Sequence, residues 1–431
     1  MLILGIETSC DETALCIIDA QGDTKSGIAI DIRANITLSQ IELHRKYGGV
    51  FPNLAKREHS KNIIPLLKSV LEKAGLLKPT TPQIRSDVLE NIRTLLVREP
   101  EMFEQFLEFI PTIEKPAIDA IAVTIGPGLE PALWVGINFA KALNAVWGIP
   151  MIPVNHMEGH IFSALLHAEE NPKSEVRNPK QILNSKSETP NQETRSYQLK
   201  AISFPSLALL ISGGHTELIL IKGWNDYELI GETRDDAVGE AFDKVARILG
   251  LPYPGGPEIS TLAEELRSMN YEVRKEREIK LPRPMIKSDD YDFSFSGLKT
   301  SVLYLVKKLP ELTEEIKRAI ALEFEDAVTE VLVSKTKRAI EARGVRTLIL
   351  GGGVIANKHL RHSFEKFAEE EGFSVFIPEL DHTTDNALMI AVAGYIKTIT
   401  PLSNQEDASL AFTADGTLRI STKNQTYPLK T

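Results

Sequence analysis

AIDAIAVTIGPGLEPALWVGINFAKALNAVWGIPMIPVNHMEGH, residues 117–160, sets the fold class of this chain. Residues 118–125 form an apolar run that ends in a Gly-Pro-Gly turn, residues 133–147 have helical periodicity, and residues 151–154 are apolar again. This order of strand, helix and strand is typical of a parallel sheet in an α/β protein. A second helix then starts beyond the end of a strand, where α/β proteins place their functional sites.

Two histidines lie in that second helix. His156 and His160 are four residues apart, which on a helix puts both imidazoles on one face, roughly 6 Å apart. Neutral imidazole suits zinc, iron, copper or nickel, so the pair can share one ion. The alternative is two unrelated core or surface histidines. Glu158 lies about 200° round the helix from His156, so the pattern differs from the zinc-protease helix H-E-x-x-H.

Toward residue 1, a polar turn separates two apolar runs. Residues 2–6 and 14–19 predict two strands, and the turn between them, residues 7–13, holds three acids together with hydroxyls and backbone N–H groups. This turn is either a plain polar hairpin or part of a site, and three acids in so tight a turn favour a site. The first run lacks a basic flank and a cleavage site, so we expect a core strand and no signal peptide.

Residues 44–116 predict helices. Residues 53–76 have the apolar stripe of a helix, and the basic and histidine side chains of residues 44–61 are expected to be solvated. These side chains are also a candidate surface for RNA or phosphate. Prolines bound two short amphipathic pieces in residues 78–116, which predict a helical insertion.

The second half of the chain repeats the glycine-turn scheme. Two apolar strands flank Ser212-Gly213-Gly214-His215-Thr216, and a third strand leads into GGGVIANKHLR at residues 351–361. Glycines in such turns let backbone N–H groups approach an anion. Residues 169–200 are polar and aperiodic and predict a mobile loop insertion. Asp385 is expected at the start of a last helix over residues 385–398, followed by a weakly structured tail over residues 401–431.

The three glycine-bearing turns, at residues 7–13, 212–216 and 351–353, predict the fold. Strand, turn and strand is the phosphate-gripping scheme of the actin, sugar-kinase and Hsp70 ATPases, and the third turn resembles their adenosine motif. A Rossmann G-x-G-x-x-G and a Walker P-loop are absent from the sequence. We therefore expect an α/β protein with a duplicated actin-like ATPase fold, two lobes around a nucleotide cleft, and two insertions. The expected lobes are residues 1–155 and residues 156–400.

Composition is that of an ordinary globular protein. The 431 residues are 42% apolar and 25% charged, which is enough chain for two or three domains with proper cores. No apolar run reaches membrane-spanning length, so we expect no membrane partner. The two cysteines cannot make a disulfide framework, which favours a reduced cytoplasmic setting. The net charge of −10 argues against a surface that is basic throughout, although a local basic patch or a basic partner can still serve a nucleic acid.

Nine motifs together resemble the bacterial tRNA threonylcarbamoyladenosine synthase family, the TsaD type. They are GIETSCDET, YGGVFPNLAKREH, GPGL, VNHMEGH, LLISGGHTEL, GEAFDKVARILGLPYPGGP, FSFSGLKT, GGGVIANKHLR and TDNALMIA, in this order from residue 2 to about residue 396. Two departures stand out: Pro131 replaces a usual glycine, and Asn53 replaces a usual glutamate. A proline has no N–H, so it cannot donate the hydrogen bond that the glycine amide can donate in relatives.

The resemblance implies a metal centre and a substrate site. It implies one divalent ion per subunit, iron(II) ahead of zinc, held by His156, His160 and Asp385. It implies that threonylcarbamoyl-AMP or another adenine nucleotide binds in the cleft. The residues implied for that site are Leu210, Ile211, Ser212, Gly213, Gly214, Asp243, Gly256 and Asn357. From the residues alone, Asp243 is equally consistent with solvated helix surface and Asn357 with an ordinary helix cap.

The implied reaction moves the threonylcarbamoyl group to the exocyclic amine of the adenosine just 3′ of the anticodon, in tRNAs that read codons beginning with A. The implied partners are tRNA and helper proteins, including a paralogous protein and a small ATPase. Asp11 and Glu12 are the carboxylates to test as general bases, with turn capping or contact with magnesium-bound water as the alternative. Two rival functions are a metallopeptidase built on the histidine pair and a non-catalytic ATP-binding scaffold.

Overall fold

A hairpin and two parallel strands build the first sheet. The computed structural model describes residues 1–168, 195–269, 279–400 and 412–420. The strand order is β5-β4-β1-β2-β3-β7-β6. β1 pairs antiparallel with β2 and parallel with β4, and β4 pairs parallel with β5. The bounds are β1 (Leu2–Glu7), β2 (Glu12–Asp23), β3 (Gly27–Ser39), β4 (Ala120–Gly126), β5 (Met151–Asn155), β6 (Leu166–Ala168) and β7 (Ser196–Leu199).

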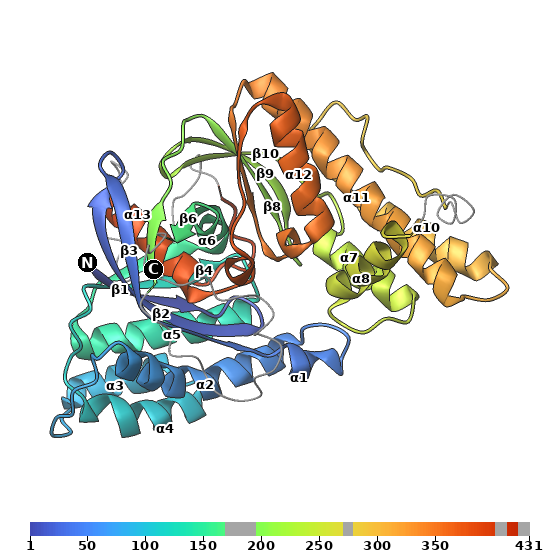
Figure 1. Cartoon of the computed structure of the whole chain (residues 1–431). Coiled ribbons are helices and arrows are strands. Elements are labelled where there is room, and N and C mark those ends of the chain that lie inside the picture. The colour runs from blue at the N-terminus through green and yellow to red at the C-terminus, as the bar shows by residue number, and fades with distance from the viewer. Residues whose placement is uncertain (169–194, 270–278, 401–411, 421–431) are drawn as a thin grey trace.

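The second sheet repeats this plan. Its order is β10-β9-β8-β11-β12, with three antiparallel strands followed by two parallel ones. This matches β3-β2-β1-β4-β5 strand for strand, so the expected duplicated fold is confirmed. The two sheets form two lobes (Figure 1). The bounds are β8 (Ser206–Ile211), β9 (Thr216–Gly223), β10 (Asp226–Glu232), β11 (Thr347–Gly351) and β12 (Ser374–Phe376).

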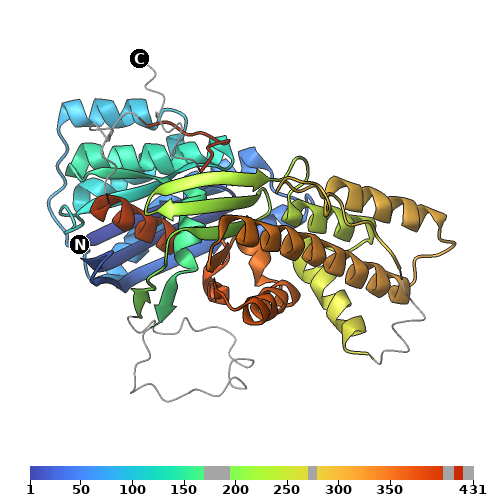
Figure 2. The same ribbon diagram turned by 90° about the horizontal axis from the view of Figure 1, so that it is seen from above.

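Helices cover both faces of the first sheet, and for that reason every residue of β4 is buried. α2 (Pro52–Lys73) and α5 (Glu130–Trp147) pack on one face, with the insertion helices α3 (Ser86–Leu95) and α4 (Pro100–Phe109) outside them. α6 (His156–Ser163) and α13 (Ala387–Ile399) pack on the other face. Figure 2 shows α13, the last helix, lying over strands from the beginning of the chain.

The second lobe buries its own apolar core between its sheet and a layer of helices. These are α7 (Val238–Ile248), α8 (Gly255–Arg267), α10 (Ser296–Lys308), α11 (Glu314–Arg343) and α12 (Lys358–Glu371). Short elements are α1 (Ile41–Arg45) and the 3-10 turns η1 (Ile110–Thr112), η3 (Gly353–Ala356) and η4 (Leu380–His382). In the described ranges, no helix combines the length and the apolar character needed to cross a membrane.

Three placements differ from the sequence-based expectations. Residues 196–199, the end of the expected loop insertion, form β7, because Tyr197 and Leu199 alternate with polar residues and bury their side chains against β3. His44 and His59 are buried, not solvated. His59 Nε2 lies 3.0 Å from the Cys10 carbonyl oxygen, and burial lowers its pKa to about 4.

The tail also packs where it is described. Residues 412–420 contain no helix or strand, yet Phe412 and Ile420 are buried in the two cores of the first lobe. The amide of Asp415 donates to the carbonyl oxygen of Ile125 at 2.9 Å. The rest of the tail and residues 169–194 lie outside the described residues.

Candidate metal centre

Helix caps fix the positions of the three candidate ligands. At the end of β5, Asn155 Oδ1 accepts from the amide of Met157, and Glu158 Oε2 accepts from the amide of Asn155. This capping box starts α6 at His156. Asn386 caps α13 in the same way and leaves Asp385 in the preceding turn.

Gly159 lets α6 and α13 approach closely. A Cβ at this position would lie 2.9 Å from Met389 Cγ and 3.1 Å from Ile390 Cδ1, both on α13. A larger residue would require the side chains of Met389 and Ile390 to move, in a contact that holds the histidines of α6 beside the carboxylate preceding α13.

The expected cluster is present. His156 Nε2 and His160 Nε2 lie 3.2 and 3.3 Å from Asp385 Oδ1, and one ligand atom of each residue lies within 4.8 Å of the others. His160 is completely buried, its Nδ1 has no hydrogen-bond partner among the described residues, and Asp385 is the one group near its Nε2 in those residues, so a further ligand at the centre would satisfy buried nitrogen that is otherwise costly. Two imidazoles and one carboxylate with room for further ligands suit a divalent transition metal. The residues therefore fit the implied ion.

The pKa shifts of the three residues bear on metal binding. Burial opposes the charge on Asp385, but His156 and His160 outweigh it and hold the pKa of this carboxyl well below its usual range. Burial lowers the pKa of His160 and His156 lowers it further, so His160 is neutral, as a ligand must be. For His156, Asp385 and Glu7 outweigh burial and raise its pKa well above the ordinary value. Binding of a cation would displace that proton.

Sequence reasoning missed Glu7 as a partner of the centre. This residue is completely buried at the end of β1, and its Oε2 lies 3.0 Å from His156 Nδ1 and accepts a 2.7 Å hydrogen bond from Thr124 Oγ1. Carboxylates placed on the far nitrogen of a ligating histidine fix its orientation and raise its basicity. The only signal was an acid at the end of a strand, and three acids shared that turn.

Asp11 and Glu12, the candidate bases, are buried at the start of β2. Burial raises the pKa of both carboxyls, and the charge of Asp385 raises them further. Glu12 Oε1 accepts a hydrogen bond from Ser39 Oγ at 3.3 Å. A carboxylate whose pKa is raised takes up a proton more readily, which suits a base.

A cavity of about 690 Å³ in the second lobe unites four of the candidate substrate residues: Gly213, Asp243, Gly256 and Asn357. Asp243 Oδ1 accepts from the amide of Gly255 at 2.7 Å, and burial raises its pKa. Asn357 Oδ1 caps α12, while its Nδ2 donates to Ser260 Oγ and Glu325 Oε1, each at 2.7 Å. Asn357 is thus a helix cap that also lines the cavity.

The other candidate substrate residues lie beside the cavity. Leu210 and Ile211 end β8 with side chains buried in the two apolar cores, so only their backbones can reach a ligand. Ser212 and Gly214 complete the turn. His215 follows, and burial together with the two metal-centre histidines lowers its pKa to about 4.

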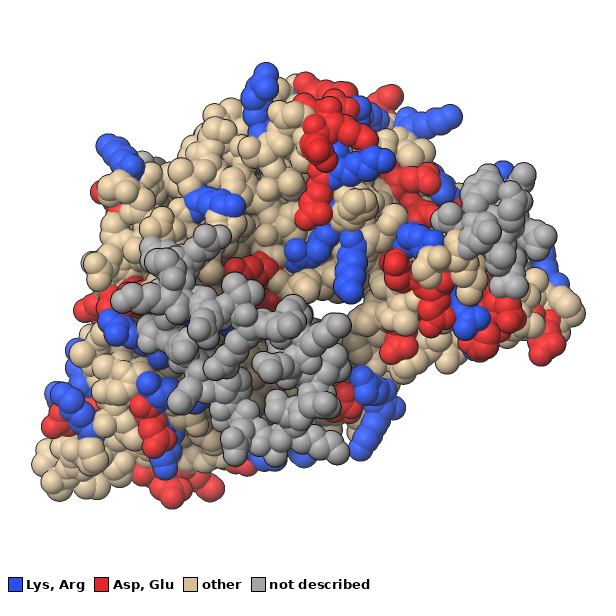
Figure 3. Space-filling view, in the orientation of Figure 1, with Lys and Arg blue, Asp and Glu red and all other residues tan. Residues whose placement is uncertain are grey.

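The third glycine turn connects the metal centre to the second sheet. A Cβ on Gly351 would lie 2.9 Å from the carbonyl oxygen of His160, so only glycine lets β11 meet α6 here. The metal centre therefore sits where the two sheets approach each other. In the space-filling view, Lys and Arg are interspersed with Asp and Glu over the visible surface (Figure 3).

Comparison with known proteins gives a consistent result. The family model described as tRNA N6-adenosine threonylcarbamoyltransferase (TsaD) matches residues 31–82, 93–177 and 192–392. A protein of that name from Ralstonia pickettii is 40% identical over 92% of this chain and 91% of its own length. One from Persephonella marina is 38% identical over 92% of this chain and 90% of its own. Among solved structures, full-length HypF with bound phosphate and nucleotide is similar with a TM-score of 0.48 and 12% identity, over 94% of this chain and 47% of HypF.

Proposed function

The chain belongs to the tRNA N6-adenosine threonylcarbamoyltransferase family, and from this premise we propose how its residues carry out the transfer. The protein is a transferase that modifies tRNA. It moves the threonylcarbamoyl group of threonylcarbamoyl-AMP to the exocyclic amine of the adenosine 3′ of the anticodon, in tRNAs that read codons beginning with A. The observation that carries the proposal is the meeting of His156, His160 and Asp385 from two distant parts of the chain.

We assign the adenylate to the cavity of the second lobe. Its adenosine part would lie near Asp243, Gly256 and Asn357, and its phosphate near the amides of the turn at residues 212–214. The metal centre, with iron(II) favoured over zinc, would lie on the carbamoyl side, because the turn after β11 runs from Gly351, which meets the backbone of His160, to Gly353, which lines the cavity. Bound there, the ion would supply Lewis-acid polarisation of a substrate oxygen.

The chemical step is an acyl transfer. The N6 amine of the adenosine forms a bond to the carbamoyl carbon, and the bond from that carbon to the phosphate oxygen breaks, so that AMP leaves with the electron pair. The amine loses a proton, which we assign to Asp11 or Glu12. Backbone N–H groups at residues 212–216 would stabilise the negative charge that develops on the carbamoyl oxygen.

The rival functions have less support. A metallopeptidase needs a carboxylate to activate water beside the ion, but Glu158 caps α6 and pairs with Lys397 at 2.7 Å. A scaffold would not require two buried histidines and a carboxylate to converge at one point. We propose further that the enzyme works in the cytoplasm with helper proteins, a paralogue and a small ATPase among them.

Nucleoside analysis of tRNA tests the function. In a strain depleted of the protein, the wild-type chain should restore threonylcarbamoyladenosine in tRNA and His156→Ala should not, although the variant folds and assembles. Restoration by His156→Ala would favour the scaffold. Proteolysis by the wild-type chain, abolished by metal removal, would favour the peptidase.

A further inference from the structure

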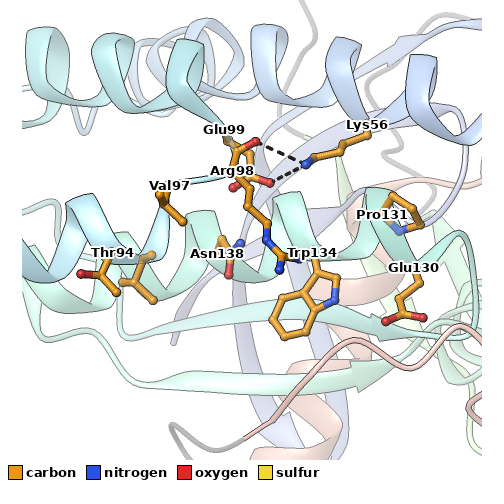
Figure 4. Close-up of a pocket in the computed structure, with 10 residues that line it drawn as sticks. Lys56, Thr94, Val97, Arg98, Glu99, Glu130, Pro131, Trp134 and Asn138 are labelled. Atoms are coloured by element: carbon orange, nitrogen blue, oxygen red, sulfur yellow. Dashed lines mark hydrogen bonds and ion pairs between the residues drawn. The ribbon is translucent and has the colours of Figure 1, made fainter.

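A second cavity, of about 490 Å³, lies on the first lobe, where the insertion meets α5 and α2. Trp134 and Asn138 come from one face of α5, Lys56 from α2, and Val97, Arg98 and Glu99 from the link between α3 and α4 (Figure 4). None of these residues belongs to the metal centre or to the substrate site of the second lobe. The family model leaves out residues 83–92, inside the insertion that builds one wall.

The link between α3 and α4 forms one wall of the cavity. Its backbone is held against α2, and two of its side chains are exposed. The Glu99 side chain is 1% exposed and pairs with Lys56 Nζ at 3.1 Å, and Lys56 also donates to the Arg98 carbonyl oxygen at 3.3 Å. These interactions hold the link between α3 and α4 against α2. Val97 is 71% exposed, and the Arg98 guanidinium has no carboxylate within ion-pair distance among the described residues.

The polar groups that line the cavity favour a ligand that has both a π-surface and hydrogen-bonding groups. Arg98 extends toward the Trp134 ring in Figure 4 and can meet an anionic group or a π-surface. The Asn138 amide can both donate and accept a hydrogen bond. An apolar side chain would satisfy none of these groups.

The helix that carries Trp134 begins next to a residue that contacts the metal centre. The amide of Leu129, which precedes α5, donates to the Ser9 carbonyl oxygen at 2.7 Å, and Ser9 Oγ lies 3.3 Å from His156 Nδ1. Trp134 is only one helical turn further along α5, roughly 6 Å from Glu130 at 1.5 Å per residue. An RNA strand with one nucleotide at the metal centre could thus place another nucleotide of the same loop at Trp134.

We propose that this cavity binds an unpaired base of the tRNA substrate, an inference that rests on the proposed function. The base would stack on Trp134, Arg98 would contact the adjoining phosphate, and the Asn138 amide would meet the polar edge of the base. Single-stranded loops are recognised in this way, by stacking on aromatic side chains and arginine. Pro131, which replaces the glycine usual in the family, lines the same cavity and adds a ring to its wall.

The test measures binding of an unmodified tRNA transcript that reads codons beginning with A to the full-length protein. Loss of stacking in Trp134→Ala should weaken the affinity by about 5- to 100-fold, and Trp134→Phe should restore most of it. Arg98→Ala should weaken binding and reduce its salt dependence. Arg93→Ala is the matched control, because Arg93 is an exposed arginine of the same insertion that pairs with Glu90 and does not line the cavity.

Equal tRNA affinity of the wild-type chain and a folded Trp134→Ala variant would overturn the inference. It would also be overturned if Trp134→Ala kept its tRNA affinity but lost a protein partner, or if AMP alone occupied the Trp134 site as tightly as tRNA does. Failure of the proposed function is read separately, in the absence of threonylcarbamoyl transfer by the wild-type chain.

Discussion

Glu7 is the residue whose replacement tests how the metal centre is held. Glu7→Gln keeps the size of the side chain but removes the charge that faces His156 Nδ1 at 3.0 Å. We expect the affinity for iron(II) or zinc to fall about 10- to 100-fold, as with other partners of ligating histidines. Competition with a chelator measures it. Glu12→Gln is the control, since Glu12 is a buried acid of the same turn and makes no hydrogen bond to a histidine among the described residues. An equal loss there would mean that net charge, not orientation, matters.

Asp385 and Glu158 should separate ligation from stability. Asp385→Ala should fold but retain little metal, because two histidines alone cannot fix the geometry of the ion. Glu158→Ala should keep its metal, yet it removes both the buried carboxylate that pairs with Lys397 at 2.7 Å and the acid of the capping box, and should lose roughly 3 kcal/mol of stability. Mass spectrometry measures the metal content of each variant, and urea unfolding measures its stability. Full metal occupancy in Asp385→Ala would remove Asp385 from the site.

Glu217 makes stability depend on pH. Burial and the nearby Glu232 raise its pKa from 4.5 to about 7. Between these pH values the unfolded chain releases the proton and the folded chain keeps it, so the free energy of unfolding falls as pH rises and stays lower above pH 7. Glu217→Gln should therefore raise the free energy of unfolding at pH 8 by up to about 3 kcal/mol, and by much less near pH 4.5.

Urea titrations at the two pH values check the Glu217 prediction. Glu369→Gln is the control, because Glu369 is exposed on α12 and should leave the stability unchanged at both. The same gain for Glu217→Gln at pH 4.5 and pH 8 would mean that the wild-type carboxyl does not titrate in this window.

At the scale of elements, the expected loop insertion at residues 169–200 ends earlier than predicted, because residues 196–199 form β7. We expect the part before β7 to be dispensable for folding. Replacing residues 170–194 with a short glycine-serine linker should cost roughly 1 kcal/mol or less, because loop-closure entropy changes slowly with length. Extending the replacement to residue 200 removes β7 and its buried Tyr197, and should cost several kcal/mol more. Thermal melting of the two variants compares them. Equal melting temperatures would mean that β7 contributes nothing to the first sheet.

Elements with a strong local sequence pattern could be predicted, and elements that depend on contacts between distant residues could not. The β4-α5-β5 unit and both glycine hairpins carry strong local patterns, so their type and order could be predicted. β7 could not be predicted, because it is a four-residue strand in a polar segment. It forms by pairing with β3, and the paired residues Ser196 and Asp31 are 165 residues apart along the chain. The cavity beside Trp134 could not be predicted either, since it exists only where three helices meet.

The candidate site shows the same limit. Helical spacing predicts that His156 and His160 share a face, but the inclusion of Asp385 came from family resemblance and not from spacing. Glu7 could not be singled out, because its role depends on the distance between two strand ends. His44 and His59 looked like surface residues, yet hydrogen bonds with Gln40 and with Cys10 satisfy them inside the protein.

At the scale of the whole molecule, several arginines join the lobes. Arg45 of α1 donates to the Tyr253 carbonyl oxygen at 2.9 Å, Arg247 of α7 donates to the Gly48 carbonyl oxygen, and Arg419 of the tail pairs with Glu232 at 2.8 Å. The sequence has a further basic stretch at residues 274–287 that is a candidate for RNA binding. Within it, Arg283 pairs with Glu323 and Glu330, and Arg274, Lys275 and Arg277 lie outside the described residues. Several of the basic side chains that could bind RNA are thus already paired with groups of the protein itself.

The basic side chains that remain on α1 and α2 should therefore carry the electrostatic part of tRNA binding. Lys46 at the end of α1, and Arg57 and Lys61 on α2, are exposed and form no ion pair within the described residues. With a net charge of −10, long-range electrostatics of the whole molecule oppose binding, so the attraction of phosphates must be local. Removal of one cation that binds a phosphate should reduce the slope of log affinity against log salt by roughly 0.7 to 0.9.

Replacing Lys46, Arg57 and Lys61 together by alanine should thus lower the slope by roughly 2 to 3 and weaken binding at low salt far more than at high salt. The measurement is tRNA affinity over a range of salt concentrations. Arg343 and Arg346, exposed at the end of α11 and just beyond it, give the matched control when both become alanine, and should leave the slope unchanged. If the triple variant keeps the wild-type slope, the phosphates bind elsewhere, and Arg98 with the surface around its cavity becomes the first region to test.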